Sequence, residues 1–258
     1  MPEASINDIT IAYETIGSDS DRPLLLIAGL SSQMVAWPDE FCRKLADGGH
    51  FVIRFDNRDC GLSTRIESGG VPDVEALMVA KLQGQPIDSP YTLSDMAADA
   101  VGLLDSLGLD RVHVCGLSMG GMIAQLIAVE YPDRVASMIS MLSTTGEPEL
   151  PGPTPEAIDA MISTPPLERS SYIRYLTGVY RAFAGGSEAF DAEASDTMAA
   201  QAYDRSFYLM GFPRQMAAII ACGSRADKLR QVKAPTLVIQ GTCDPLVSIE
   251  HGQATANA

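Results

Sequence analysis

Apolar residues along the chain fall into two kinds of stretch that alternate. Five short runs are almost continuously apolar, as strands covered on both faces are: residues 24–28, 51–55, 111–115, 136–142 and 235–241. The longer stretches between them, such as Met119–Glu130, repeat apolar residues three and four positions apart, which is a helical spacing. This alternation predicts an α/β fold with a doubly wound, mostly parallel sheet, whose site lies at the carboxyl ends of the strands.

Three further segments complete the expected core. Residues 5–15 alternate between apolar and polar positions and predict one or two strands at the edge of the sheet. Thr92 and Asp95 match a capping box, which predicts a core-facing helix that ends at Gly108. Residues 66–91 form a longer connection than a crossover needs, with a short helix expected at the rim of the site, and the sequence does not indicate its role.

The alternation stops at residues 146–212. Prolines crowd the first part of this region, and two or three helices are expected after them. More than half of the aromatic residues of the chain lie between Tyr172 and Phe212. We therefore expect a helical lid here, inserted between two parts of one core at 1–145 and 213–258. Its aromatic residues would line an apolar pocket, form the lid's own core, or do both.

One predicted strand passes directly into a helix at Ser118. A turn this sharp forces the serine backbone toward a strained conformation and brings the residues two before and two after it into contact, so both must lack a side chain. Gly116 and Gly120 meet that requirement. The turn raises the Ser118 hydroxyl at the carboxyl end of the strand and directs the Met119 amide at the same space, which suits a catalytic nucleophile.

The Gly-Leu-Ser-Met-Gly sequence at 116–120 resembles the nucleophile elbow of the α/β-hydrolase family. Its continuation, Gly-Met-Ile-Ala-Gln, is similar to esterase, lactonase and cofactor-free haloperoxidase members. Residues 24–63 and the elbow together look like aclacinomycin-methylesterase-like members. The resemblance implies that Leu30 N–H joins Met119 N–H in an oxyanion hole, although Ala28 stands where the family has histidine.

The same resemblance assigns Asp244 as the carboxylate of the catalytic triad. In the family a G-x-x-D-P-L-V segment presents this acid, and Gly-Thr-Cys-Asp-Pro-Leu-Val occurs here at 241–247. A turn-forming role before Pro245 is the alternative for this residue. The loop at 143–146, which follows the preceding strand, contains no acid, and this favours Asp244.

A serine nucleophile needs a general base, and none of the three histidines occupies the family's position for it. His50 precedes a strand, and His113 lies within the strand before Ser118, where it is expected to pack in the core. His251 resembles the residue that opens the family's next helix and is expected to be structural rather than a substitute base.

The resemblance therefore implies that the family's last strand, catalytic histidine and final helix are missing from this sequence. The strand near Thr236 and Gln240 would then be an unprotected edge, or would be covered by another chain in a homo-oligomer. Without its base, the serine would keep only the rate enhancement of the oxyanion hole and of substrate binding, so activity is expected to fall by several powers of ten.

The segment Asp-Asn-Arg-Asp-Cys-Gly-Leu-Ser at 56–63 resembles the family's D-x-R-x-x-G-x-S segment. Its charged residues are expected to tie loops together through hydrogen bonds rather than to take part in catalysis. A metal site is disfavoured here because no histidine lies nearby in the sequence.

Composition limits the partners. The 258 residues include 18 basic and 33 acidic ones, a formal charge of −15 with a pI near 4.5, which disfavours nucleic acid and anionic membranes. The five cysteines are scattered without C-x-x-C spacing, so neither a disulfide framework nor a zinc site is expected, and no cofactor is indicated. The first residues lack the features of a signal peptide, and a cytoplasmic location is expected.

These features predict a serine hydrolase that acts on a hydrophobic small molecule. It would cleave a carboxylic ester, such as a methyl ester, or a lactone through an acyl-enzyme at Ser118. The alternatives are a cofactor-free haloperoxidase-like enzyme or a C–C bond hydrolase that uses the same triad. A third alternative, suggested by the absent histidine, is a catalytically silent member that binds a small ligand.

Overall fold

The computed structural model describes residues 1–188 and 190–258 and contains one seven-stranded sheet. The strands are β1 (Glu3–Ile6), β2 (Ile9–Ile16), β3 (Arg22–Ile27), β4 (His50–Phe55), β5 (Val112–Leu117), β6 (Val135–Met141) and β7 (Thr236–Ile239). Their order is β1-β2-β4-β3-β5-β6-β7, with antiparallel pairing for β1 with β2 and for β2 with β4, and parallel pairing elsewhere. The expected mostly parallel sheet is confirmed.

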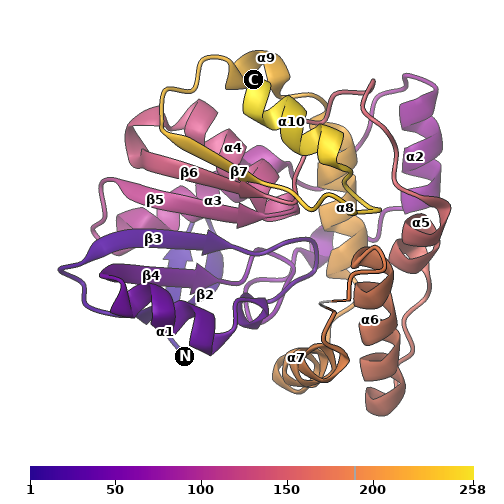
Figure 1. Cartoon of the computed structure of the whole chain (residues 1–258), viewed down its shortest axis with the longest axis horizontal. Coiled ribbons are helices and arrows are strands. Elements are labelled where there is room, and N and C mark those ends of the chain that lie inside the picture. Colours follow the sequence, from indigo (N-terminus) through magenta and orange to yellow (C-terminus); the bar gives the residue numbers. More distant parts are fainter. Residues whose placement is uncertain (189) are drawn as a thin grey trace.

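Helices cover both faces of the sheet (Figure 1). They are α1 (Asp39–Asp47), α2 (Val74–Leu82), α3 (Leu93–Ser106), α4 (Met119–Glu130), α5 (Pro155–Ile162), α6 (Arg169–Phe183), α7 (Ala192–Arg205), α8 (Gly211–Cys222), α9 (Ala226–Leu229) and α10 (Ile249–Asn257). Short 3₁₀ turns occur at Met34–Ala36, Glu67–Gly69 and Pro132–Arg134. In Figure 1, α1 lies in front of the sheet and α3 and α4 lie behind it.

Side-chain alternation along the strands divides the core into two clusters. Leu25 and Ile27 of β3 belong to the large cluster that includes α3 and α4 residues, whereas Leu24 and Leu26 belong to a smaller cluster with Trp37 and residues of α1. Every strand that is buried on both faces must therefore be apolar at consecutive positions, which is the pattern in the sequence.

The segment at residues 5–15 forms two strands, but only β1 lies at the sheet edge, because β2 pairs with β1 on one side and with β4 on the other. The expectation of edge strands is thus right for β1 and wrong for β2. The predicted capping box is confirmed: Thr92 accepts from Asp95 N–H and the Asp95 carboxylate accepts from Thr92 N–H. The helix that it begins, α3, ends at Ser106 before Gly108.

The region 146–212 contains α5, α6 and α7, which lie beyond the arrowheads of the parallel strands in Figure 1. We call this region the insertion; residue 189 within it lies outside the described residues. Its aromatic residues pack between α6 and α7, with the Tyr172 ring 5.5 Å from Tyr203 and 5.1 Å from Phe207. Burial raises the pKa of Tyr172 to about 12. These rings form an internal core of the insertion.

At the other end of the sheet order, β7 is an edge strand with two exposed apolar side chains, Leu237 (53%) and Ile239 (41%). Helix α10 packs against it. Among the described residues, no helix combines the length and the apolar character needed to cross a bilayer.

Candidate active site

Ser118 occupies the turn between β5 and α4, as the sequence predicts. Its φ of +55° and ψ of −117° lie outside the conformations that non-glycine residues ordinarily adopt. Ser118 N–H donates to Met141 O at 2.8 Å, and Ser143 Oγ donates to Ser118 O at 2.8 Å, so the end of β6 holds this backbone in place. Backbone strain of this kind persists only where the surroundings enforce it, and it is typical of functional residues.

The glycines around Ser118 permit this turn. A Cβ on Gly116 would lie 2.0 Å from Gly120 O, and one on Gly120 would lie 2.1 Å from Ile27 O. A Cβ on Gly121 would lie 2.6 Å from the Ser143 Cβ, so this glycine lets α4 approach the end of β6. The contact between residues 116 and 120 that the sharp turn predicts is therefore present.

The loop after β3 approaches the serine side chain. A Cβ on Gly29 would lie 3.4 Å from Ser118 Cβ and 4.0 Å from Ser118 Oγ. Within the part of the chain that the structure describes, neither Leu30 N–H nor Met119 N–H has a hydrogen-bond acceptor. An oxyanion hole requires two such unpaired amides directed at the same point. We call residues 29–34, which contain one of the two amides that the sequence predicts for this role, the oxyanion loop.

Asp244 lies in the loop after β7. Its Oδ1 accepts from Leu246 N–H and Val247 N–H, both at 2.9 Å, and its Oδ2 accepts from Gln240 Nε2 at 3.2 Å. The turn-forming role and a catalytic role are therefore compatible, since the backbone amides hold only one oxygen while the other bonds to a side chain.

Ser118 and Asp244 both lie at the carboxyl ends of the parallel strands, and the end of β6 lies between them. Ser118 N–H bonds to Met141 O, and Leu142 N–H bonds in turn to Ile239 O at 2.8 Å. Two strand spacings place the backbones at the ends of β5 and β7 about 10 Å apart.

His50 and His113 cannot provide that imidazole, because they lie at the amino-terminal edge of the sheet, opposite Ser118. His50 begins β4, and His113 is the second residue of β5. Their rings meet edge to face at 6.4 Å, and His113 Nδ1 lies 2.7 Å from Ser137 Oγ. The pKa of His113 is lowered, mainly by burial and secondly by the charge of the nearby His50.

His251, on α10, uses both ring nitrogens in structural hydrogen bonds. Nε2 lies 2.8 Å from Pro151 O, which can only accept, so Nε2 carries the proton. Nδ1, 2.7 Å from Thr144 Oγ1, then accepts from that hydroxyl. His251 thus joins α10 to the loop after β6 and to the insertion, which agrees with a structural role.

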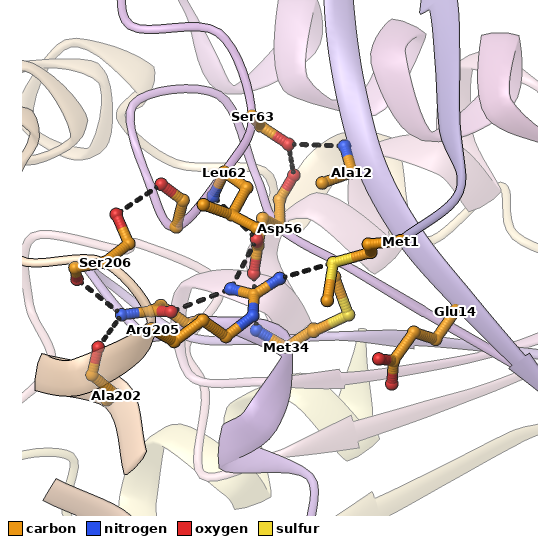
Figure 2. A network of polar contacts seen from close by, with 12 residues as sticks. Met1, Ala12, Glu14, Met34, Asp56, Leu62, Ser63, Ala202, Arg205 and Ser206 are labelled. Carbon is orange, nitrogen blue, oxygen red and sulfur yellow. Dashed lines mark hydrogen bonds and ion pairs between the residues drawn. The ribbon is translucent and has the colours of Figure 1, made fainter. Parts of the chain in front are cut away.

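The charged residues at 56–63 tie loops together, as expected from the sequence. Figure 2 shows Arg205, the last residue of α7, pointing at the Asp56 carboxylate, and the two form a 2.7 Å ion pair. Asp56 also accepts from Met34 N–H and Leu62 N–H. Burial raises the pKa of Asp56, and Arg205 opposes this shift. The pair links the oxyanion loop to the insertion.

Two further ion pairs stabilise the same region. Arg214 of α8 binds Asp59 through two hydrogen bonds of 2.7 and 2.8 Å, and both side chains are essentially inaccessible to solvent. Arg58 binds Asp99 of α3 in the same bidentate manner. All four charged side chains are hydrogen-bonded in pairs, so none of them is free to act as a catalyst.

An apolar groove of about 290 Å³ lies beside the elbow helix. Helices α2 and α8 supply half of its lining residues, and Met122, one turn along α4 from Ser118, is another. The unexplained connection at 66–91 therefore contributes α2 as one wall of this groove. Within the described ranges, no group of three or more His, Cys, Asp or Glu side chains is arranged to hold a metal ion.

A family model described as alpha/beta hydrolase fold matches residues 22–258. This chain belongs to the α/β-hydrolase fold family. Among curated proteins, this α/β-hydrolase is 31% identical to rhodomycin D methylesterase DnrP of Streptomyces peucetius, over the whole of this chain and 87% of that protein. It is 24% identical to 3-oxoadipate enol-lactonase 2 of Acinetobacter baylyi, over 95% of this chain and 80% of the relative. The sequence-based expectation of a hydrolase is confirmed.

Solved structures show the same fold. A meta-cleavage product hydrolase from Pseudomonas fluorescens IP01 superposes with a TM-score of 0.74 at 19% identity, covering 100% of this α/β-hydrolase and 85% of that chain. The enol-lactonase from Burkholderia xenovorans LB400 superposes with a TM-score of 0.69 at 24% identity, covering 99% and 87%.

Sequence reasoning missed two buried polar residues that hold loops in place: Gln215 of α8, and Arg225, which lies between α8 and α9. Gln215 is fully buried and accepts from Ser31 N–H, and Arg225 bonds to Gln125 Oε1 and Thr144 O. Its position beside Arg214, at the start of an otherwise apolar helical stretch, was the only local signal for Gln215. Its partner lies 184 positions away in the chain, and no local pattern indicates such a pairing.

Proposed function

We propose that this protein hydrolyses a carboxylic ester, such as a methyl ester, or a lactone of a hydrophobic small molecule, with Ser118 as the nucleophile. The observation that supports this most directly is the strained Ser118 backbone beside two amides without acceptors. The similarity to proteins named methylesterase and enol-lactonase supports the bond type. The apolar groove beside α4 and the aromatic residues of the insertion, which we propose is a lid, suit a hydrophobic substrate.

In the proposed mechanism, Ser118 Oγ attacks the acyl carbon while an imidazole removes its proton. Leu30 N–H and Met119 N–H bind the oxygen as it becomes negative, and each such donor typically lowers the barrier by about 3 kcal/mol. The imidazolium then protonates the leaving alkoxide, and a water molecule hydrolyses the acyl-enzyme by the same steps in reverse order. Asp244 would orient the imidazole and stabilise its charged form.

We further propose that none of the three histidines supplies this imidazole. His50 and His113 are at the wrong edge of the sheet, and both nitrogens of His251 are engaged. A free imidazole molecule should therefore increase the activity of these 258 residues if the space between Ser118 and Asp244 is open to it.

The test is hydrolysis of p-nitrophenyl butyrate with and without about 50 mM imidazole, in the wild type and in the Ser118→Ala variant. We expect a Ser118-dependent rate that imidazole raises by more than about tenfold, since general base catalysis contributes roughly 10²- to 10⁴-fold. Equal rates in both proteins at every imidazole concentration would contradict the proposal and favour a ligand-binding member.

A C–C bond hydrolase is the second candidate. The chain is 31% identical to a relative from Paraburkholderia phymatum named 2-hydroxy-6-oxononadienedioate/2-hydroxy-6-oxononatrienedioate hydrolase. The match covers 95% of this chain and 78% of the relative. Turnover of a vinylogous 1,5-diketone acid that exceeds ester turnover by more than tenfold would favour this candidate over an esterase.

A further inference from the structure

The oxyanion loop contains a tight turn that needs external support. Ser32 N–H donates to Gly29 O at 3.1 Å, which closes a four-residue turn with Leu30 and Ser31 at its centre. Ser31 has a φ of +54°, the sign required at the third position of a type II turn, where glycine or asparagine is usual. Serine adopts this conformation at a cost, so the surroundings must stabilise it.

Gln215 supplies that support from α8. Its Oε1 accepts from Ser31 N–H at 2.7 Å, and its Nε2 donates to Arg58 O at 2.8 Å. The side chain is 0% exposed, so both ends of the carboxamide are used within the protein. A buried amide is costly unless it is fully hydrogen-bonded, and an apolar residue would fill the same position without that cost. The presence of a polar residue at 215 is therefore explained best by the hydrogen bond that it accepts from Ser31 N–H.

The other end of Gln215 is itself firmly held. The neighbouring Arg214 binds Asp59, and Arg58 binds Asp99, so the backbone that receives Nε2 is fixed on both sides. Ser31 N–H is thereby tied to a rigid point in the core. Leu30 directly precedes Ser31, and its own N–H is unpaired within the described chain.

We infer that Gln215 is a positioning residue of the oxyanion hole: it fixes the turn at Ser31 and so directs Leu30 N–H at the acyl oxygen. This inference rests on the proposed hydrolase function. Gln215 touches no reacting atom, and its effect is transmitted through one hydrogen bond to the loop. A shift of about 1 Å in a catalytic group can lower the rate by roughly 100-fold.

The test compares Gln215→Leu and Gln215→Glu with the wild type in Ser118-dependent hydrolysis of p-nitrophenyl butyrate with added imidazole. The leucine variant loses both hydrogen bonds at similar volume. We expect its kcat to fall by about 10- to 100-fold while KM changes less than about twofold, because a misdirected amide affects the transition state more than substrate binding. Gln125→Leu is the matched control, since Gln125 is equally buried and makes two hydrogen bonds, to Ser140 Oγ and Arg225 Nε, rather than to the oxyanion loop.

The glutamate variant gives a readout that a purely structural role would not change. A neutral carboxyl at 215 accepts from Ser31 N–H and donates to Arg58 O, as glutamine does, whereas the ionised form loses the donor and places a negative charge against the Arg58 carbonyl oxygen. Burial raises the pKa of such a carboxyl. The ratio of variant kcat to wild-type kcat should therefore be near one at about pH 5.5 and should fall as the pH rises.

A ratio that is independent of pH, or a leucine variant whose kcat stays within about twofold of the control's, would overturn the inference. If the leucine variant does not fold, the pH dependence of the glutamate variant decides alone. Absence of Ser118-dependent turnover in the wild type would contradict the proposed function and this inference together, which distinguishes that outcome from a specific failure at Gln215.

Discussion

At the scale of single residues, the site depends on positions where no other side chain fits. Gly116 and Gly120 approach backbone oxygens so closely that a methyl group would overlap with them, and Ser118 adopts a positive φ between them. Carbonyl oxygens of the sheet and the elbow cannot move aside as flexible side chains can. The sequence shows these positions because glycine and serine stand at a fixed spacing where a strand meets a helix.

We expect Gly116→Ala to lower the free energy of unfolding by more than about 3 kcal/mol or to prevent folding, because its Cβ would lie 2.0 Å from Gly120 O. Gly178→Ala is the matched control: this glycine lies within α6, and a Cβ there would meet no atom of a neighbouring described element within 4 Å. Alanine at 178 should therefore stabilise the protein by about 0.5–1 kcal/mol. Urea denaturation measures both. Similar effects for the two variants would contradict the account of the elbow.

At the scale of elements, loops at the carboxyl ends of the strands are joined by buried polar side chains. Asp56, after β4, accepts from Met34 N–H in the oxyanion loop and pairs with Arg205 at the end of α7 (Figure 2). Gln33 donates to Ala202 O and Ser206 O and accepts from Arg205. The insertion and the oxyanion loop are thus parts of one network of hydrogen bonds.

Replacing only one partner of the Asp56–Arg205 pair should lower the free energy of unfolding more than replacing both partners. Arg205→Met leaves the carboxylate buried without its cation, and we expect a loss of about 3 kcal/mol in unfolding free energy. Adding Asp56→Asn to this variant should restore more than about 1 kcal/mol relative to the sum of the single effects. A double-mutant cycle in urea measures this coupling, and strictly additive effects would show that the pair is not an energetic unit.

Elements were predictable from the sequence to different degrees. The strands and α4 follow from apolar periodicity, and α3 follows from its capping box, because local physics determines both. The position of β2 inside the sheet depended on pairing with β4, which no local pattern shows. Ser118 and Gly116 were recognisable from spacing, whereas Gln215 and Arg205 bind partners 184 and 172 positions away in the chain.

At the scale of the whole molecule, the sheet ends in an exposed edge. Leu237 and Ile239 of β7 present apolar side chains to solvent, and unprotected edges of this kind favour pairing with another strand. The formal charge of −15 opposes association between copies. The balance between these two effects decides the oligomeric state, and we propose that the edge governs it.

Sedimentation velocity should therefore show association of the wild type that increases with protein concentration and with salt, because salt screens the repulsion. Leu237→Lys should shift the protein to the monomer, since charged side chains protect natural edge strands. Leu167→Lys, at an apolar residue of the insertion that is 71% exposed, is the control and should leave association unchanged. A wild type that is monomeric at every concentration would refute the proposed role of β7.

The strained serine at position 118 is the proposed nucleophile, supported by two amides. The most direct measurement is reaction with a fluorophosphonate, followed by mass spectrometry of the intact protein and of its peptides. We predict a single adduct on the peptide that contains Ser118 and no adduct in Ser118→Ala. Unmodified wild-type protein after prolonged exposure in the presence of imidazole, or an adduct on any other residue, would contradict the claim.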